Sequence, residues 1–261
     1  METESRCNYV HLEIEAAHTK QNAKQTHFHL QQAKTGHHDV VAFHSAKRVH
    51  QAITAAAEKK LLCWLAQRTP AWVNSDYLTV LGFLGQCGAG VCYAFAARTR
   101  YALIGAVLCV VLNWFGDSLD GTLARVRDQQ RSRYGFYVDH MCDAFGAVFL
   151  MVGLALSGYL HGAVAIAMLL SFLVLAIESY LATYTLGSFH MSQGLFGPTE
   201  IRILLVIGTI RLMFSPYSEL FGRRYLLFDI GGVIATIGMA FMAVFTTVKH
   251  IRELYRAEPL P

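Results

Sequence analysis

The second long apolar stretch of the chain, residues 101–126, reads YALIGAVLCVVLNWFGDSLDGTLARV. Its first two-thirds carries no charge and comes close to the ~20 residues that a helix needs to cross the bilayer core. Its end carries Asp117, Asp120 and Arg125. Because charged side chains within the membrane are costly, their presence there indicates function rather than packing. The stretch therefore predicts a membrane-spanning helix that ends in a functional site.

The composition of the whole chain agrees with a membrane protein. Of its 261 residues, 54% are hydrophobic and only 15% are charged, with a mean hydropathy of +0.36, which is too apolar for an ordinary soluble domain. The net charge is +4, and the basic residues cluster beside apolar stretches, which favours membrane lipids and phosphates as partners and not nucleic acid. The six cysteines form no C-x-x-C pair, so we expect reduced thiols.

Six apolar segments are expected to cross the membrane. The fifth is the shortest and contains Arg202 and Arg211. The expected fold is an all-α integral membrane protein with six transmembrane helices, preceded by an amphipathic interfacial helix. The six segments are residues 77–97, 101–126, 135–158, 163–185, 200–214 and 225–248.

The regions on either side of these segments are polar or amphipathic. Residues 1–45 are rich in histidine, but their spacing fits no closed metal site, so a solvated extension is expected. Residues 46–69 alternate apolar and basic residues at a helical period, which predicts a juxtamembrane helix on the membrane surface. The six-helix domain is expected to cover residues 70–250, and residues 251–261 to form a cytoplasmic tail.

The distribution of lysine and arginine predicts the orientation. Six spans place both termini on one side, and that side, with the connection between the second and third spans, holds most of these residues. By the positive-inside rule this side is cytoplasmic. We expect a multi-pass membrane protein, located in the inner membrane if it is bacterial, with its site facing the cytoplasm.

Four aspartates form the candidate site. Asp117 and Asp120 share a face of one helix, and Asp139 and Asp143 lie one turn apart on the next. Two adjacent antiparallel helices would aim these carboxylates at one spot, where their mutual repulsion requires cations. Carboxylate oxygens suit Mg²⁺, Mn²⁺ or Ca²⁺ rather than zinc. As the deepest acid on its helix, Asp143 is placed to accept a proton from an alcohol.

The residues around these acids indicate diphosphate chemistry. Gly121, Ala124 and Gly135 are small where a bulky substrate must approach the backbone. Several arginines are placed to receive phosphate oxygens through charge-assisted hydrogen bonds: Arg125, Arg127, Arg131 and Arg133. The structural alternative is a salt bridge from Asp117 or Asp120 to Arg125. It leaves the other acids unexplained, because Arg125 is the only basic residue expected inside the cluster.

The run D-x2-D-G-x2-A-R-x9-G-x3-D-x3-D, from Asp117 to Asp143, resembles the signature of the CDP-alcohol phosphatidyltransferase family at all eight of its fixed positions. The interval between Arg125 and Gly135 is at the longer end for that family. The resemblance extends more loosely over residues 77–248 and does not include residues 1–45. The sequence of residues 139–143, DHMCD, is also similar to the D-H-x-C-D of choline and ethanolamine phosphotransferases.

The resemblance implies an enzyme of phospholipid biosynthesis that transfers a substituted phosphate from a CDP-alcohol to an acceptor alcohol and releases CMP. It implies two divalent ions, Mg²⁺ or Mn²⁺, held by the four aspartates, with Asp143 as the general base. The lipid is either the donor, with a polar alcohol as acceptor, or the acceptor of a soluble donor. Family members are often homodimers. The implied CDP-binding residues are Asp117, Gly121, Ala124 and Arg125, with Gly135 allowing close helix contact.

The pattern of acids also bears on two other classes of function. A divalent-cation transporter would spread its acids through the membrane depth, whereas these acids concentrate at the cytoplasmic ends of two helices. A non-catalytic membrane scaffold would lack one of the acids, and none is missing.

Further polar residues in the apolar segments allow two interpretations each. Glu178, and Glu200 with Arg202, either shape the acceptor pocket or pair within the bundle. Asn113 either hydrogen-bonds within the metal site or ties two helices together. Asp229 is expected to be a structural charge on the opposite side of the membrane.

Overall fold

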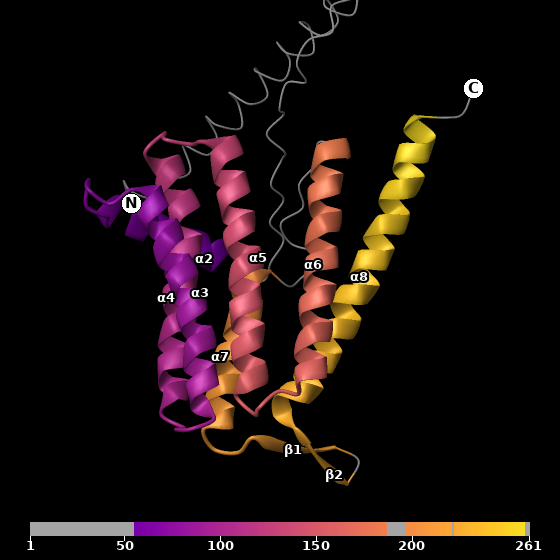
Figure 1. Ribbon diagram of the computed structural model, residues 1–261. Helices are drawn as coiled ribbons and strands as arrows, with labels where there is room; N and C mark the ends of the chain where they lie inside the picture. Colours follow the sequence, from indigo (N-terminus) through magenta and orange to yellow (C-terminus); the bar gives the residue numbers. More distant parts are fainter. Residues whose placement is uncertain (1–54, 187–196, 221, 259–261) are drawn as a thin grey trace, which may run out of the picture.

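The computed structural model describes residues 55–186, 197–220 and 222–258 (Figure 1). The expected extension, residues 1–45, and residues 46–54 of the expected surface helix lie outside these ranges. The described part is mostly helical, and its helices follow the predicted apolar segments closely. They are α2 (Ala55–Arg68), α3 (Ser75–Ala96), α4 (Ala102–Val126), α5 (Ser132–Leu156), α6 (Gly162–Leu186), α7 (Pro198–Leu212) and α8 (Leu227–Ala257).

Five described helices are long and apolar enough to cross a membrane: α3, α4, α5, α6 and α8. The remaining expected span, residues 200–214, corresponds to α7, which has only 15 residues. At 1.5 Å per residue it is about 22 Å long, which is less than the ~30 Å of the bilayer core. Helix α8 continues to Ala257, so most of the expected tail after residue 250 is helical.

The start of α7 is fixed by its own sequence. Pro198 occupies the first turn, where the missing N–H costs nothing. The Glu200 carboxylate accepts a hydrogen bond of 2.9 Å from the backbone N–H of Gly197 and so caps the helix. These two residues explain why the helix begins at Pro198, two residues before the expected apolar segment.

Helix α3 is the centre of the packing. It packs against both α4 and α5, which contact each other far less, while α6 packs against α5 and α8. Helix α7 packs against α4, and α2 lies against α4 as well. Figure 1 shows α3, α4 and α5 grouped together and α6 beside α8, with the α4–α5 connection and the end of α8 at the same end.

Glycines bring these helices into backbone contact. A Cβ atom on Gly116 of α4 would overlap the backbone of Gly82 in α3, and one on Gly153 of α5 would overlap the carbonyl of Gly90 in α3. Such contacts let the backbones approach closely, as is common between membrane helices. The glycines of α3 thus set the separation between the two acid-bearing helices.

One polar contact and a second apolar cluster supplement this packing. Tyr93 in α3 is fully buried and shares a hydrogen bond of 2.5 Å with Thr209 in α7. Near α2, a second apolar cluster joins Leu62 and Ala66 to Leu119 and Leu123 of α4. Helix α2 is therefore packed onto the segment that carries Asp117 and Asp120.

The mostly helical fold is consistent with the expected all-α class. The structure adds one short element, an antiparallel hairpin of β1 (Tyr217–Leu220) and β2 (Arg223–Leu226) between α7 and α8. Its turn contains Gly222 at a φ of 74°, a backbone conformation that favours glycine. Among the cysteines expected to be reduced, Cys63 is disulfide-bonded, whereas Cys87, Cys92, Cys109 and Cys142 are free.

We predict that Gly153→Ala lowers the thermal unfolding midpoint of the detergent-solubilised protein. The added methyl group must push α5 away from the Gly90 carbonyl, and overpacking of this kind costs about 1–3 kcal/mol. This exceeds the roughly 1 kcal/mol by which alanine improves helix propensity over glycine. The control is Gly238→Ala in α8, where a Cβ meets no atom within 4 Å. Equal midpoints for the two variants would contradict the contact.

Candidate functional site

The four predicted acids come from the same end of the bundle. Asp117 and Asp120 lie in the last turns of α4, and Asp139 and Asp143 lie in the first half of α5. The short α4–α5 connection joins these two regions at the upper end of Figure 1. The two helices are not packed side by side as expected, because α3 lies against both of them. Asp143 of α5 nevertheless lies near enough to Asp117 and Asp120 of α4 for their charges to interact.

Asp120 is held most firmly of the four. Its side chain is buried, and its Oδ2 accepts a hydrogen bond of 2.5 Å from the Thr79 hydroxyl of α3. Its Oδ1 contacts the backbone N–H of Gly121, and its backbone carbonyl accepts a bond of 3.1 Å from Ser75. A buried carboxylate needs such donors, and here α3 supplies two of the three contacts.

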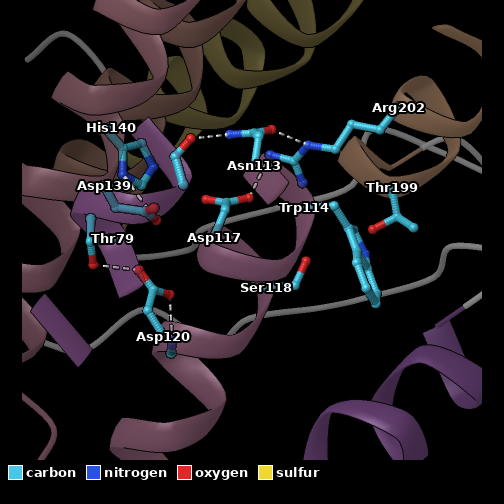
Figure 2. A network of polar contacts seen from close by, with 12 residues as sticks. Thr79, Asn113, Trp114, Asp117, Ser118, Asp120, Asp139, His140, Thr199 and Arg202 are labelled. Carbon is cyan, nitrogen blue, oxygen red and sulfur yellow. Dashed lines mark hydrogen bonds and ion pairs between the residues drawn. The ribbon is translucent and has the colours of Figure 1, made fainter. Parts of the chain in front are cut away.

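Asp117 is paired with an arginine from a distant helix. The Arg202 guanidinium of α7 lies 2.5 Å from Oδ2 of Asp117 and donates a hydrogen bond of 2.8 Å to Oδ1 of Asn113. The Asn113 amide in turn donates to the Gly82 carbonyl of α3 at 3.0 Å. Figure 2 shows Asn113 and Asp117 directed at Arg202. Asn113 thus ties helices together, and the expectation that Arg125 is the only basic residue in the cluster was wrong.

Asp139 and Asp143 line the α5 side of the cluster. Asp143 is partly buried and faces the negative charges of Asp117 and Asp120 and the positive charge of Arg202. The Asp139 carboxylate lies 3.9 Å from the ring of His140. That ring stacks on Phe136 at a centroid distance of 4.1 Å and meets Tyr180 of α6 edge-on at 4.8 Å. These aromatic rings join the acid-bearing part of α5 to α6.

The donor set fits a hard divalent cation by its chemistry. Four carboxylates from two helices crowd negative charge into one region, and oxygen ligands of this kind hold Mg²⁺ or Mn²⁺. In the conformations seen, no three histidine, cysteine, aspartate or glutamate side chains in the described ranges converge closely enough to hold one ion. Two of the acids are turned to protein donors, Asp117 to Arg202 and Asp120 to Thr79. Metal binding by all four therefore requires side-chain movement.

The other predicted site residues lie around these acids. Gly121 and Ala124 are half-buried on α4, and Arg125 is exposed, with its guanidinium 3.0 Å from the Thr122 hydroxyl. Gly135 is also exposed, and among the described residues a Cβ placed on it would meet no atom within 4 Å. The expected close helix contact is therefore not seen within the described ranges. Gly135 borders open space beside the start of α5.

Two of the neighbouring arginines fasten the α4–α5 connection. Arg127 donates hydrogen bonds to the carbonyls of Thr69 and Pro70, at 2.9 and 3.0 Å, in the α2–α3 connection. Arg131 forms an ion pair with Asp76 in the first turn of α3. Both side chains hold the connection in place, and these contacts account for their presence without a phosphate.

A second polar centre lies beside the acids and was not predicted. Oε1 of Glu58 in α2 accepts hydrogen bonds from Trp114 at 3.0 Å and Ser118 at 3.2 Å, both in α4. It also accepts a bond of 2.7 Å from Thr199 of α7. One carboxylate oxygen thus joins three helices next to Asp117. No sequence spacing indicates this contact, because its members lie up to 141 positions apart.

The remaining polar residues pair within the bundle. Glu178 of α6 lies 2.6 Å from the ring of His250 in α8, and both side chains are mostly buried. Asp229 accepts a hydrogen bond of 2.8 Å from the backbone N–H of His161 and also contacts its ring. The structural interpretation of Asp229 is confirmed, and Glu178 joins α6 to α8.

One family model matches more than half of the chain. The sequence model of the CDP-alcohol phosphatidyltransferase family matches residues 72–248. Cholinephosphotransferase 1 of Danio rerio is 26% identical over 168 residues, which cover 59% of this chain. The match spans only 42% of that relative's length. The crystal structure of Mycobacterium tuberculosis phosphatidylinositol phosphate synthase with CDP-DAG bound superposes with a TM-score of 0.44 at 18% identity, over 78% of this chain and 92% of that one.

We predict that Glu58→Ala lowers the thermal unfolding midpoint in detergent more than Lys59→Ala does. The Glu58 variant leaves three donors on α4 and α7 without their acceptor, and an unsatisfied buried donor costs about 1–3 kcal/mol. Lys59 is an exposed neighbour in the same helix and provides the control. Equal midpoints for the two variants would show that the Glu58 contacts contribute nothing to stability.

Proposed function

Because the chain belongs to the CDP-alcohol phosphatidyltransferase family, we propose that it transfers a substituted phosphate from a CDP-alcohol to an acceptor alcohol and releases CMP. The observation that carries this proposal is the family match to residues 72–248, which includes the whole stretch from Asp117 to Asp143. Asp143 on α5 also lies near enough to Asp117 and Asp120 on α4 for their charges to interact. Arg202 and Thr79 compensate Asp117 and Asp120, but they do not explain why a further acid lies beside them.

The proposed metal ligands are the four aspartates, which would hold two Mg²⁺ or Mn²⁺ ions. When bound, the ions supply positive charge that neutralises the diphosphate and the departing CMP. The proposed CDP-binding face comprises Gly121, Ala124 and Arg125 with Asp117. The open space beside Gly135 supports a substrate position there.

The chain's own residues bind, orient and move a proton. Arg125 is exposed at the end of α4, where its guanidinium can bind phosphate oxygens. The acceptor hydroxyl attacks the phosphorus distal to cytidine, the bond to the CMP oxygen breaks, and Asp143 takes the hydroxyl proton. The Thr79 bond to Asp120 holds one carboxylate in place before the substrates arrive.

The sequence of residues 139–143 and the similarity to a cholinephosphotransferase favour a soluble CDP-alcohol as donor and a lipid alcohol as acceptor. In this mode the donor enters from water at the end of α4, and the acceptor arrives from the bilayer. The reverse mode, with a lipid donor and a polar alcohol as acceptor, is the other outcome of the assay below.

The proposed placement in the membrane follows the charge distribution. The segment at residues 200–214 is the proposed remaining crossing, which makes six in the domain at residues 70–250, and α2 lies on the membrane surface. The site then faces the cytoplasm, on the side richer in lysine and arginine. A homodimer is the proposed assembly, as in other members of the family.

We predict that the purified protein releases CMP in the presence of Mg²⁺ and that Asp143→Asn reduces the rate at least about a hundredfold, the usual effect of losing a general base. The assay offers CDP-choline or CDP-ethanolamine with diacylglycerol, and separately CDP-diacylglycerol with pooled polar alcohols. The active mixture identifies the donor mode. The control is Asp128→Asn, because Asp128 is exposed and has a φ of 54° that asparagine tolerates. No CMP release in either mixture would refute the proposal and favour a scaffold.

Metal dependence is a separate prediction. EDTA should abolish CMP release, and excess Mg²⁺ should restore it, because the carboxylates alone cannot neutralise a diphosphate. Liposomes containing the protein should show no uptake of Mn²⁺ in the absence of a CDP compound. Such uptake would support the transporter in place of the transferase.

A further inference from the structure

Arg202 has an unusual position for a residue of an apolar helix. It lies in the second turn of α7, and its side chain is 15% exposed. Its guanidinium contacts Asp117 at 2.5 Å and Asn113 at 2.8 Å, and it also faces the charge of Asp143. A positive charge thus lies among the carboxylates that the proposed function assigns to metal ions.

The surroundings hold the guanidinium in this position. The Asn113 side chain is buried, and its amide is fixed by the bond to the Gly82 carbonyl of α3. The Asn113 oxygen therefore points at Arg202. An arginine cannot lose its proton under ordinary conditions, so the positive charge leaves Asp117 only when the side chain moves. A divalent ion that takes Oδ2 of Asp117 must displace it.

We propose that Arg202 is an internal counter-ion for Asp117, which holds this carboxylate while the metal site is empty and competes with the divalent ions for it. Arg202 is a positioning residue in this sense, since it acts on the metal ligands. The proposal rests on the metal site of the proposed function but not on CMP release. It also explains why no three acids converge in the conformations of the described residues.

Two roles of Arg202 can be told apart by the change in metal affinity when its side chain is removed. A residue that orients Asp117 for the metal would lower metal affinity when removed. A competing cation would raise it. The two roles therefore predict changes of opposite sign in one measurement, and a general loss of folding would raise neither affinity nor metal-dependent stability.

The test measures Mn²⁺ binding to the purified full-length protein in detergent, without any CDP compound, from the electron paramagnetic resonance signal of free Mn²⁺. We expect Arg202→Gln to bind Mn²⁺ more tightly than the unmodified chain by on the order of tenfold, the effect that one nearby charge has on an ionic equilibrium. Without metal, its thermal midpoint should be lower, and Mn²⁺ should raise that midpoint by more than in the unmodified chain.

Two further variants act as controls. Arg202→Lys keeps the charge and should bind Mn²⁺ about as the unmodified chain does. Arg211→Gln removes the same charge from the same helix nine positions further along, about 13 Å away, and should change nothing. Unchanged or weaker Mn²⁺ binding by Arg202→Gln would overturn the counter-ion role. Tighter binding by this variant would support it even if the unmodified protein released no CMP.

Discussion

The whole arrangement depends on keeping several carboxylates together at the edge of a poorly solvated region. Each of these charges is costly unless a donor or a cation compensates it. The structure supplies different compensation for different acids. Asp120 is satisfied by Thr79 and a backbone N–H, and Asp117 is satisfied by Arg202. Thr79 comes from α3 and Arg202 from α7, so the packing of the bundle determines which donors reach the acids of α4.

Helix α3 makes the packing contacts that hold the two acid-bearing helices together. It carries no member of the predicted acid signature, yet it touches α4 through Gly82 and α5 through Gly90. It also provides Thr79 for Asp120 and the Gly82 carbonyl for Asn113. The helix-packing glycines of α3 therefore also set the distance between the acids.

Sequence reasoning predicted the local features well and the long-range contacts poorly. The bounds of α3 to α6 and the positions of the acids follow from hydropathy and helical spacing, which are local properties. The hairpin at residues 217–226 was missed because its strands are short, and α7 is shifted two residues toward the N-terminus from its expected segment, where Pro198 and Glu200 fix its start. The partnerships of Arg202 and Glu58 could not be predicted, because they join residues far apart in the chain.

These long-range contacts can form only in a certain order while the chain is being synthesised. Asp117 and Ser118 are synthesised well before the α7 residues to which they are connected, since Arg202 follows Asp117 by 85 positions. While the ribosome is still making α5 and α6, Asp117 lacks Arg202, and Glu58 has only its two partners on α4. Domains are generally made and folded from the N-terminus. These contacts of the site are therefore completed only when α7 is made, after α3 to α6 have been synthesised.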